Sequence, residues 1–236
     1  MRVALFVPCY VDATDPETGL ATARLLRRLG HEVVYPEGQT CCGQPALNAG
    51  HLGEFLAVAR RQLDALAEGG ADAVVSPSGS CVAALRRVGP HRAKLDHPLL
   101  PRLYELTEFL TERLGVTDVG ARFPATVTWH DACHSLRELG ISEGPRRLLR
   151  AVEGLTLREM VKSDECCGFG GLFSVKLPEV SVGMGERKIG AIEATGADWV
   201  ASTDSSCLMH IDGMLRKRRS PVRGIHIAKI LAGGNA

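Results

Sequence analysis

The chain has 236 residues, of which 45% are hydrophobic and 23% charged, and its 28 basic side chains nearly balance its 27 acidic ones. This balance excludes a disordered protein, a collagen-like repeat and a protein that binds nucleic acid through bulk positive charge. No apolar run reaches the roughly 18 residues of a membrane helix. We therefore expect a cytoplasmic protein without a membrane span, built from one or two domains at about 150 residues each.

Short apolar or β-branched runs alternate with stretches of helical periodicity in the first half of the chain. The runs 2–8, 32–36 and 73–77 are predicted strands, and 18–29 and 52–67 are predicted helices. Strands that alternate with helices are typical of an α/β fold, in which a parallel sheet is flanked by helices.

The second half follows the same order. Strands are predicted near 125–130 and 198–202, and helices near 144–152 and 181–194. The pattern around 155–160 is ambiguous. The two halves therefore have the same expected architecture, a small parallel sheet with helices on its faces.

Eight cysteines repeat one spacing pattern in the two halves. Each half has a lone cysteine, then Cys-Cys-Gly about 32 residues later, then another lone cysteine about 40 residues beyond, and the two sets are 124 to 126 positions apart. The first set is Cys9, Cys41, Cys42 and Cys81, and the second set is Cys133, Cys166, Cys167 and Cys207. This repetition indicates an internal duplication, and we predict two pseudo-symmetric domains, 1–120 and 121–236.

Each of these cysteines or cysteine pairs is expected to follow a strand. In a parallel sheet the carboxyl ends of the strands share one edge, which is where such folds bind their ligands. The four thiols of each half are therefore predicted to converge on one pocket per half.

Cysteines make up about 3.4% of the chain, well below the share in disulfide-stapled scaffolds. In a reducing compartment, paired cysteines favour metal binding or redox chemistry, and gathered thiolates suit zinc, copper(I) or iron–sulfur clusters. The chain has no Cys-x-x-Cys and no compact ferredoxin motif. Adjacent cysteines suit a larger or less regular cluster than a cubane, because their side chains diverge. Space-filling buried cysteines and a redox-active vicinal disulfide remain open as alternatives.

Histidines distinguish the second half from the first. His130 and His134 flank Cys133, and His210 follows Cys207 by three positions. Histidine can ligate a metal or carry protons near neutral pH, so these three residues are candidate proton carriers beside a redox centre. We therefore expect the second site to be the more reactive or metal-competent one and the first to be more structural. The alternative is that His130 and His134 cap or hydrogen-bond the local backbone.

Several segments resemble the lactate utilization protein A family, and more broadly the cysteine-rich domain shared by heterodisulfide reductase and the iron–sulfur component of glycolate oxidase. The segments are Glu37–Pro45, Ser76–Cys81, Asp164–Gly171 and Cys207–Met209. The resemblance implies a cytoplasmic iron–sulfur redox subunit of an L-lactate (2-hydroxy acid) oxidation complex, an oxidoreductase that passes electrons through its clusters. It also implies two partners, a ferredoxin-type iron–sulfur subunit and a smaller third subunit.

The chain departs from the broader family at one ligand position in each half. In heterodisulfide reductase five cysteines per half hold a non-cubane 4Fe-4S cluster, whereas here Ser78 and Asp204 stand three residues before the last cysteine. An oxygen ligand suits iron less well than a soft thiolate. The alternative function is a thiol-rich or zinc-binding scaffold subunit that assembles the complex without transferring electrons. The chain has no flavin or nicotinamide fingerprint, so we expect hydride abstraction to need another subunit.

Overall fold

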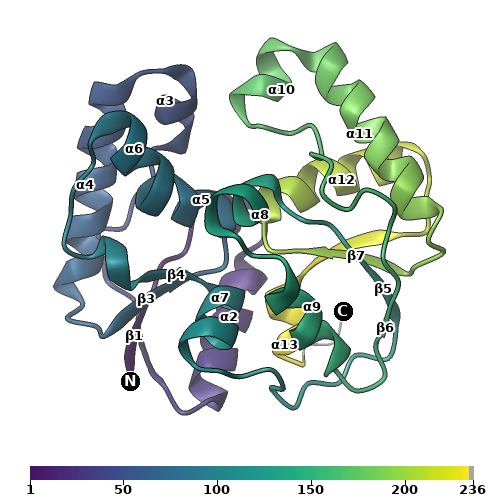
Figure 1. The fold of residues 1–236 in the computed structure, drawn as a ribbon, viewed down its shortest axis with the longest axis horizontal. Helices are drawn as coiled ribbons and strands as arrows, with labels where there is room; N and C mark the ends of the chain where they lie inside the picture. The colour runs from purple at the N-terminus through teal and green to yellow at the C-terminus, as the bar shows by residue number, and fades with distance from the viewer. Residues whose placement is uncertain (234–236) are drawn as a thin grey trace.

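The computed structural model describes residues 1–233 of the protein and contains two four-stranded parallel sheets (Figure 1). The first sheet has the order β2-β1-β3-β4 and the second β6-β5-β7-β8. The strands are β1 (Arg2–Leu5), β2 (Glu32–Val34), β3 (Ala73–Ser76), β4 (Leu103–Glu105), β5 (Thr126–Trp129), β6 (Thr156–Leu157), β7 (Trp199–Ser202) and β8 (Arg223–His226). The predicted α/β fold with two repeats is confirmed.

Helices connect the strands in the same order in both halves. They are α1 (Cys9–Thr14), α2 (Pro16–Arg28), α3 (Gln44–Ala49), α4 (Leu52–Glu68), α5 (Gly79–Ala83), α6 (Gly89–Ala93), α7 (Leu106–Glu108), α8 (Cys133–Leu139), α9 (Glu143–Arg150), α10 (Leu172–Lys176), α11 (Pro178–Glu193), α12 (Ser205–Lys217) and α13 (Ile227–Leu231). Shorter helical turns are η1 (Ala84–Val88), η2 (Leu100–Arg102) and η3 (Phe109–Arg113). The four predicted helices correspond to α2, α4, α9 and α11. Within residues 1–233, no helix combines the length and apolar character needed to cross a membrane.

Equivalent hydrogen bonds hold the first strand of each sheet. The backbone N–H of Arg2 donates to the carboxylate of Asp72 at 2.8 Å, and that of Thr126 donates to Asp198 at 2.9 Å. Each aspartate ends a Gly-Ala-Asp tripeptide that the sequence repeats 126 positions apart. The duplication therefore extends to individual side-chain contacts.

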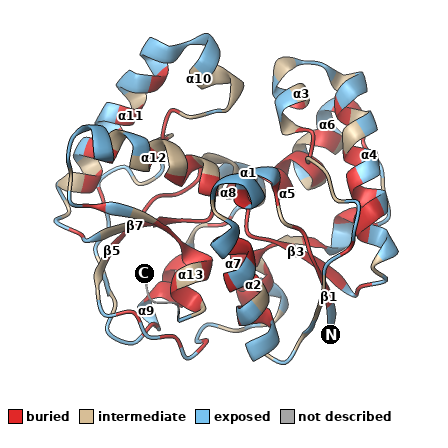
Figure 2. Ribbon diagram, turned by 180° about the vertical axis from the view of Figure 1, so that it is seen from behind, coloured by how far each residue is buried: buried red, intermediate tan, exposed pale blue. Residues whose placement is uncertain are grey.

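The two halves share a central hydrophobic core. In Figure 1, α2 and α7 from the first half and α9 and α13 from the second lie between the two sheets, with α4 outside the first sheet and α11 outside the second. The central core contains Leu25, Phe109, Trp129, Leu149 and Ile227, all less than 2% exposed. Figure 2 shows these helices from behind, with their buried residues in red.

Each sheet falls within one of the predicted domains, 1–120 and 121–236, although the last three residues of the second lie outside the described residues. The central core draws apolar side chains from both sides of this boundary. The boundary itself stays a prediction, and the shared core indicates that the halves stabilise each other.

At the carboxyl ends of the strands the halves meet through two equivalent helix pairs, α5 with α8 and α1 with α12. The first pair approaches closely at Gly79. A Cβ atom at this position would lie 1.8 Å from Ser135 Oγ and 2.9 Å from Ser135 Cβ. The missing side chain of Gly79 therefore sets the spacing of the two halves beside the cysteines.

We expect Gly79→Ala to lower the free energy of unfolding by about 1–3 kcal/mol, because the added methyl group overpacks the α5–α8 contact. Urea denaturation measures the change. Gly53→Ala is the matched control, since a Cβ atom on Gly53 in α4 meets no atom within 4 Å and alanine is the better helix former by roughly 1 kcal/mol. Equal stability of the two variants would contradict the close contact.

Candidate metal centre

All eight cysteines line one cavity of about 340 Å³ between the two halves. We name Cys9, Cys41, Cys42 and Cys81 the first quartet, and Cys133, Cys166, Cys167 and Cys207 the second quartet. The predicted convergence within each half is observed. The expectation of one separate pocket per half is corrected, because both quartets open into the same cavity. None of the eight forms a disulfide.

The thiols of each quartet form a contiguous row. In the first quartet Cys41 interacts with Cys9 and Cys42, and Cys42 also interacts with Cys81. The second quartet repeats these contacts, with Cys166 between Cys133 and Cys167, and with Cys167 next to Cys207. Neighbouring sulfurs of each quartet therefore lie next to one another along the wall of the cavity.

The glycine of each Cys-Cys-Gly motif turns the chain sharply. Gly43 has φ 83° and Gly168 has φ 91°, both in the left-handed region that favours glycine. A Cβ atom on Gly43 would lie 2.9 Å from the Phe55 ring, and one on Gly168 would lie 2.5 Å from the Ser181 carbonyl oxygen. The two glycines are therefore required both by conformation and by space.

These turns also aim a backbone donor at one sulfur of each quartet. The N–H groups of Gly43 and Gly168 each donate to the sulfur two residues earlier, Cys41 or Cys166, at 3.4 Å. The pKa of Cys41 is held well below its usual range, mainly by the neighbouring Cys42 thiol and further by the Cys9 thiol and the Gly43 N–H. The pKa of Cys166 is lowered in the same way, because Cys133, Cys167 and the Gly168 N–H surround it. Each quartet therefore favours at least one thiolate, the form that binds metals.

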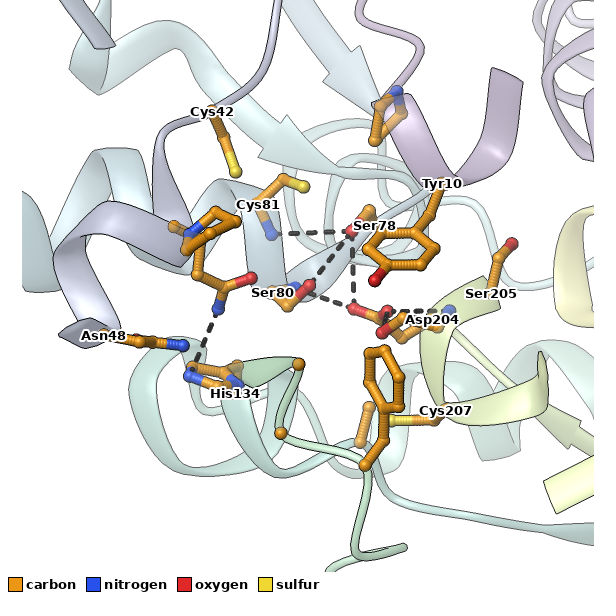
Figure 3. A pocket seen from close by; sticks show the side chains of 18 of the residues that line it. Tyr10, Cys42, Asn48, Ser78, Ser80, Cys81, His134, Asp204, Ser205 and Cys207 are labelled. Atoms are coloured by element: carbon orange, nitrogen blue, oxygen red, sulfur yellow. Dashed lines mark hydrogen bonds between the residues drawn. The ribbon is translucent and has the colours of Figure 1, made fainter. Parts of the chain in front are cut away.

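The walls of the cavity cross from one half to the other. Tyr10, which follows Cys9, contacts Phe169 of the second half edge to face, with ring centroids 5.6 Å apart. His134, which follows Cys133, approaches the first half, with its Nε2 3.4 Å from Gln44 Nε2 (Figure 3). These are equivalent positions, so each half closes the cavity over the other.

Ser78 and Asp204, which replace the additional cysteines of the broader family, meet each other in the centre of the molecule. Ser78 Oγ donates to Asp204 Oδ2 at 3.3 Å, and the backbone N–H of Ser80 donates to the same oxygen at 3.0 Å (Figure 3). Ser78 also caps α5 by accepting the Cys81 N–H, and Asp204 caps α12 by accepting the Ser206 N–H. Both side chains line the cavity, and each caps one of the four helices that carry its cysteines.

His130 lies behind the second quartet. It is completely buried, and neither of its ring nitrogens has a hydrogen-bond partner among the described residues. One ring nitrogen and the sulfurs of Cys167 and Cys207 all lie within 4.8 Å of one another. Burial, together with the positive charge of Lys188, lowers the pKa of His130 to about 4, so that the ring is uncharged at neutral pH.

The other two candidate proton carriers occupy different surroundings. His134 lines the cavity, and its Nδ1 lies 3.6 Å from Cys133 Sγ. His210 packs against Phe169, with ring centroids 6.0 Å apart, and burial lowers the pKa of its imidazole. Neither His130 nor His210 is among the residues that line the cavity. A role for the three histidines in proton transfer stays a prediction.

Sequence reasoning missed a buried ion pair that supports the second quartet. Arg146 in α9 donates two hydrogen bonds to Asp131, at 2.9 and 2.8 Å, and two to Glu159, at 2.8 and 3.2 Å. Burial opposes ionisation of Asp131, but the hydrogen bonds from Arg146 outweigh it and lower the pKa of Asp131. Trp129 also donates to Asp131, at 2.8 Å. This network fixes the segment between β5 and Cys133.

Lys188 supports the second Cys-Cys-Gly loop and was also missed. It is 1% exposed, and its Nζ donates to the carbonyl oxygens of Lys162 at 2.9 Å and Ser163 at 3.2 Å. Gln62 stands 126 positions earlier and accepts the Thr40 N–H just before the first Cys-Cys-Gly. Equivalent positions of α4 and α11 thus anchor the two loops. The side chain is a neutral amide in the first half and an amine in the second. The 126-residue spacing could have revealed the pair.

The donors present fit a soft metal or an iron–sulfur cluster. Each quartet supplies four thiols at the carboxyl edge of a parallel sheet, a donor set that selects zinc, copper(I) or iron–sulfur clusters over hard cations. The unpartnered nitrogen of His130 adds a donor that imidazole-binding metals accept.

This arrangement defines a class of protein. The family model described as "Cysteine-rich domain" matches the chain twice, over residues 3–86 and 127–212. The two matches contain the two quartets, so each repeat is one copy of this domain.

Curated relatives narrow the class further. The chain is 45% identical to lactate utilization protein A of Exiguobacterium sp. over 240 residues, covering 99% of this chain and 98% of that protein. It is 43% identical to lactate utilization protein A of Geobacillus kaustophilus over 242 residues, covering all of both chains. The chain belongs to the lactate utilization protein A family.

A solved structure shares the fold. The crystal structure of a hypothetical protein from Helicobacter pylori superposes with a TM-score of 0.62 at 14% sequence identity. The match covers 100% of this chain and 49% of the other, so the chain spans about half the length of that protein.

Proposed function

We propose that the chain is an iron–sulfur redox subunit of an L-lactate (2-hydroxy acid) oxidation complex in the cytoplasm. The observation that carries the proposal is the convergence of eight thiols, in two rows of four, on one cavity between the halves. The relatives of the same length are named for lactate utilization, which supports lactate as the substrate of the complex. The proposed partners are a ferredoxin-type iron–sulfur subunit and a third subunit.

In this proposal the two quartets hold iron–sulfur clusters, and such clusters accept and release single electrons when bound. The residues of the chain bind and surround them. The N–H groups of Gly43 and Gly168 donate to thiolate sulfur, a contact that helps to set the potential of a bound cluster. Tyr10 and Phe169 line the cavity from opposite halves, and their rings contact each other edge to face.

Oxidation of L-lactate to pyruvate releases two electrons and two protons, and these need separate routes. Clusters held by the quartets would exchange the electrons with a partner subunit, one at a time. His134 is the proton-carrier candidate in the cavity wall, where it adjoins Cys133.

A second candidate function is a zinc-binding or thiol-rich scaffold that assembles the complex without transferring electrons. The close group of His130, Cys167 and Cys207 favours it, because zinc binds mixed imidazole and thiolate ligands. Anaerobic purification distinguishes the two functions: a brown protein that reductant bleaches supports the first, and a colourless protein with stoichiometric zinc supports the second.

The activity is tested by anaerobic co-expression of the chain with a ferredoxin-type iron–sulfur subunit and a third subunit from the same organism. We expect the purified complex to reduce an artificial electron-accepting dye when L-lactate is added. The matched control carries Cys42→Ala and Cys167→Ala in this chain, and dye reduction should fall to background. Equal rates with both forms would contradict electron transfer through the quartets.

A further inference from the structure

A buried histidine, His130, lies beside the second quartet, and its ring nitrogens have no hydrogen-bond partner among the described residues. His130 directly follows β5 and is 0% exposed. A buried polar group without a partner costs free energy, typically about 1–3 kcal/mol. Both ring nitrogens of His130 are in this state among residues 1–233. One of them lies within 4.8 Å of the sulfurs of both Cys167 and Cys207.

The first half provides an internal comparison at the same position. Phe6 stands 124 residues before His130, and the backbone N–H groups of the two residues make equivalent sheet hydrogen bonds of 2.9 Å. Phe6 is also 0% exposed and belongs to the same apolar cluster as Cys42 and Cys81. Packing alone is therefore satisfied by a phenyl ring in this fold. The imidazole in the second half adds a donor that packing does not need.

We propose that His130 is a ligand in a mixed nitrogen and sulfur metal site of the second half, together with Cys167 and Cys207. The inference rests on the metal binding proposed above and goes beyond the cysteines to a ligand that distinguishes the two halves. An imidazole beside two cysteine sulfurs suits zinc or an iron atom of an iron–sulfur cluster. Coordination also gives one orphaned ring nitrogen of His130 a partner.

His134 is the competing nitrogen donor, since its Nδ1 lies 3.6 Å from Cys133 Sγ. Unlike His130, it lines the cavity and has a second polar neighbour in Gln44. His134→Phe therefore serves as the matched control for His130→Phe. Phe6 shows that the position of His130 can accept a phenylalanine in the repeated fold.

The test uses the full chain with the first quartet disabled by Cys41→Ser and Cys42→Ser, so that any bound Co²⁺ is held by the second quartet. The reduced, metal-free protein is titrated with Co²⁺ under argon. Charge-transfer absorption measures thiolate ligation, and pulsed electron paramagnetic resonance detects coordinated ¹⁴N. We expect an imidazole signal in this parent. His130→Phe should abolish the signal and weaken Co²⁺ binding by roughly 10–100-fold or more, while His134→Phe should preserve both.

The inference and the proposed function fail in different ways. Thiolate bands in the parent without an imidazole signal, or with a signal that persists in His130→Phe, would overturn the role of His130 and leave metal binding by the cysteines intact. Absence of any bound Co²⁺ would overturn both. A His134→Phe protein grown with ¹⁵N-labelled histidine shows, without a change at position 130, whether the bound nitrogen belongs to a histidine. Its modulation must change from that of ¹⁴N to that of ¹⁵N, and an unlabelled pattern contradicts the ligand.

Discussion

Cys133→Ala is expected to remove most of the iron and acid-labile sulfide from anaerobically purified protein, whereas Cys9→Ala should remove a smaller share. Cys133 is partly buried in the quartet that also contains the nitrogen donor His130, and Cys9 is an exposed thiol of the quartet that has Phe6 instead. A metal centre with more donors and less contact with water loses its metal less readily, so we expect the second half to hold most of the iron and sulfide of the unmodified protein. Disabling that half therefore removes more of both.

Iron and sulfide content per chain measures this difference directly. Tyr10→Phe is a suitable control, because it keeps the aromatic contact with Phe169 and changes no sulfur. It should retain the iron and sulfide of the unmodified protein. Equal losses in the two cysteine variants would contradict the asymmetry between the halves.

Arg146→Ala is expected to lower the free energy of unfolding of the metal-free protein by about 3–5 kcal/mol, as removal of one partner from a buried ion pair typically does. The substitution leaves the Asp131 carboxylate, 5% exposed, without the two hydrogen bonds that offset its burial. The neighbouring Arg147→Ala should cost at most about 1 kcal/mol, since Arg147 pairs with Glu112 on the surface. Urea denaturation of the two variants provides the comparison.

A double variant identifies the cause. If the uncompensated charge of Asp131 dominates, Arg146→Ala with Asp131→Asn should be more stable than Arg146→Ala alone. A double variant less stable than the single one would show that packing of the arginine, and not the buried charge, is responsible.

The sequence predicted the repeated sheets and the convergence of the cysteines because these depend on spacing. A thiol that follows a parallel strand must lie at the carboxyl edge of its sheet, whichever residues pack beneath it. Cys9 and Cys133 accordingly start the helices that follow β1 and β5. Periodicity located α4 and α11, but it missed β4, which has only three residues, and β8, whose apolar run is interrupted by Arg223 and Gly224.

The single shared cavity could not be predicted from either half alone, since it depends on how the two halves pack. The approach of α5 to α8 at Gly79 brings the quartets together, and nothing in the local pattern marks that glycine as a contact. Ser78 and Asp204 could be recognised as equivalent positions, but not as neighbours. Their contact follows from the pseudo-twofold arrangement of the halves.

The most direct test of the account is the iron and acid-labile sulfide content of the full-length protein purified under strict exclusion of oxygen, measured together with its free thiols. We expect a coloured protein in which iron and sulfide are both present and the eight cysteines resist thiol reagents until the metal is removed. A folded protein without iron, sulfide or another soft metal, with all eight thiols reacting freely, would contradict it.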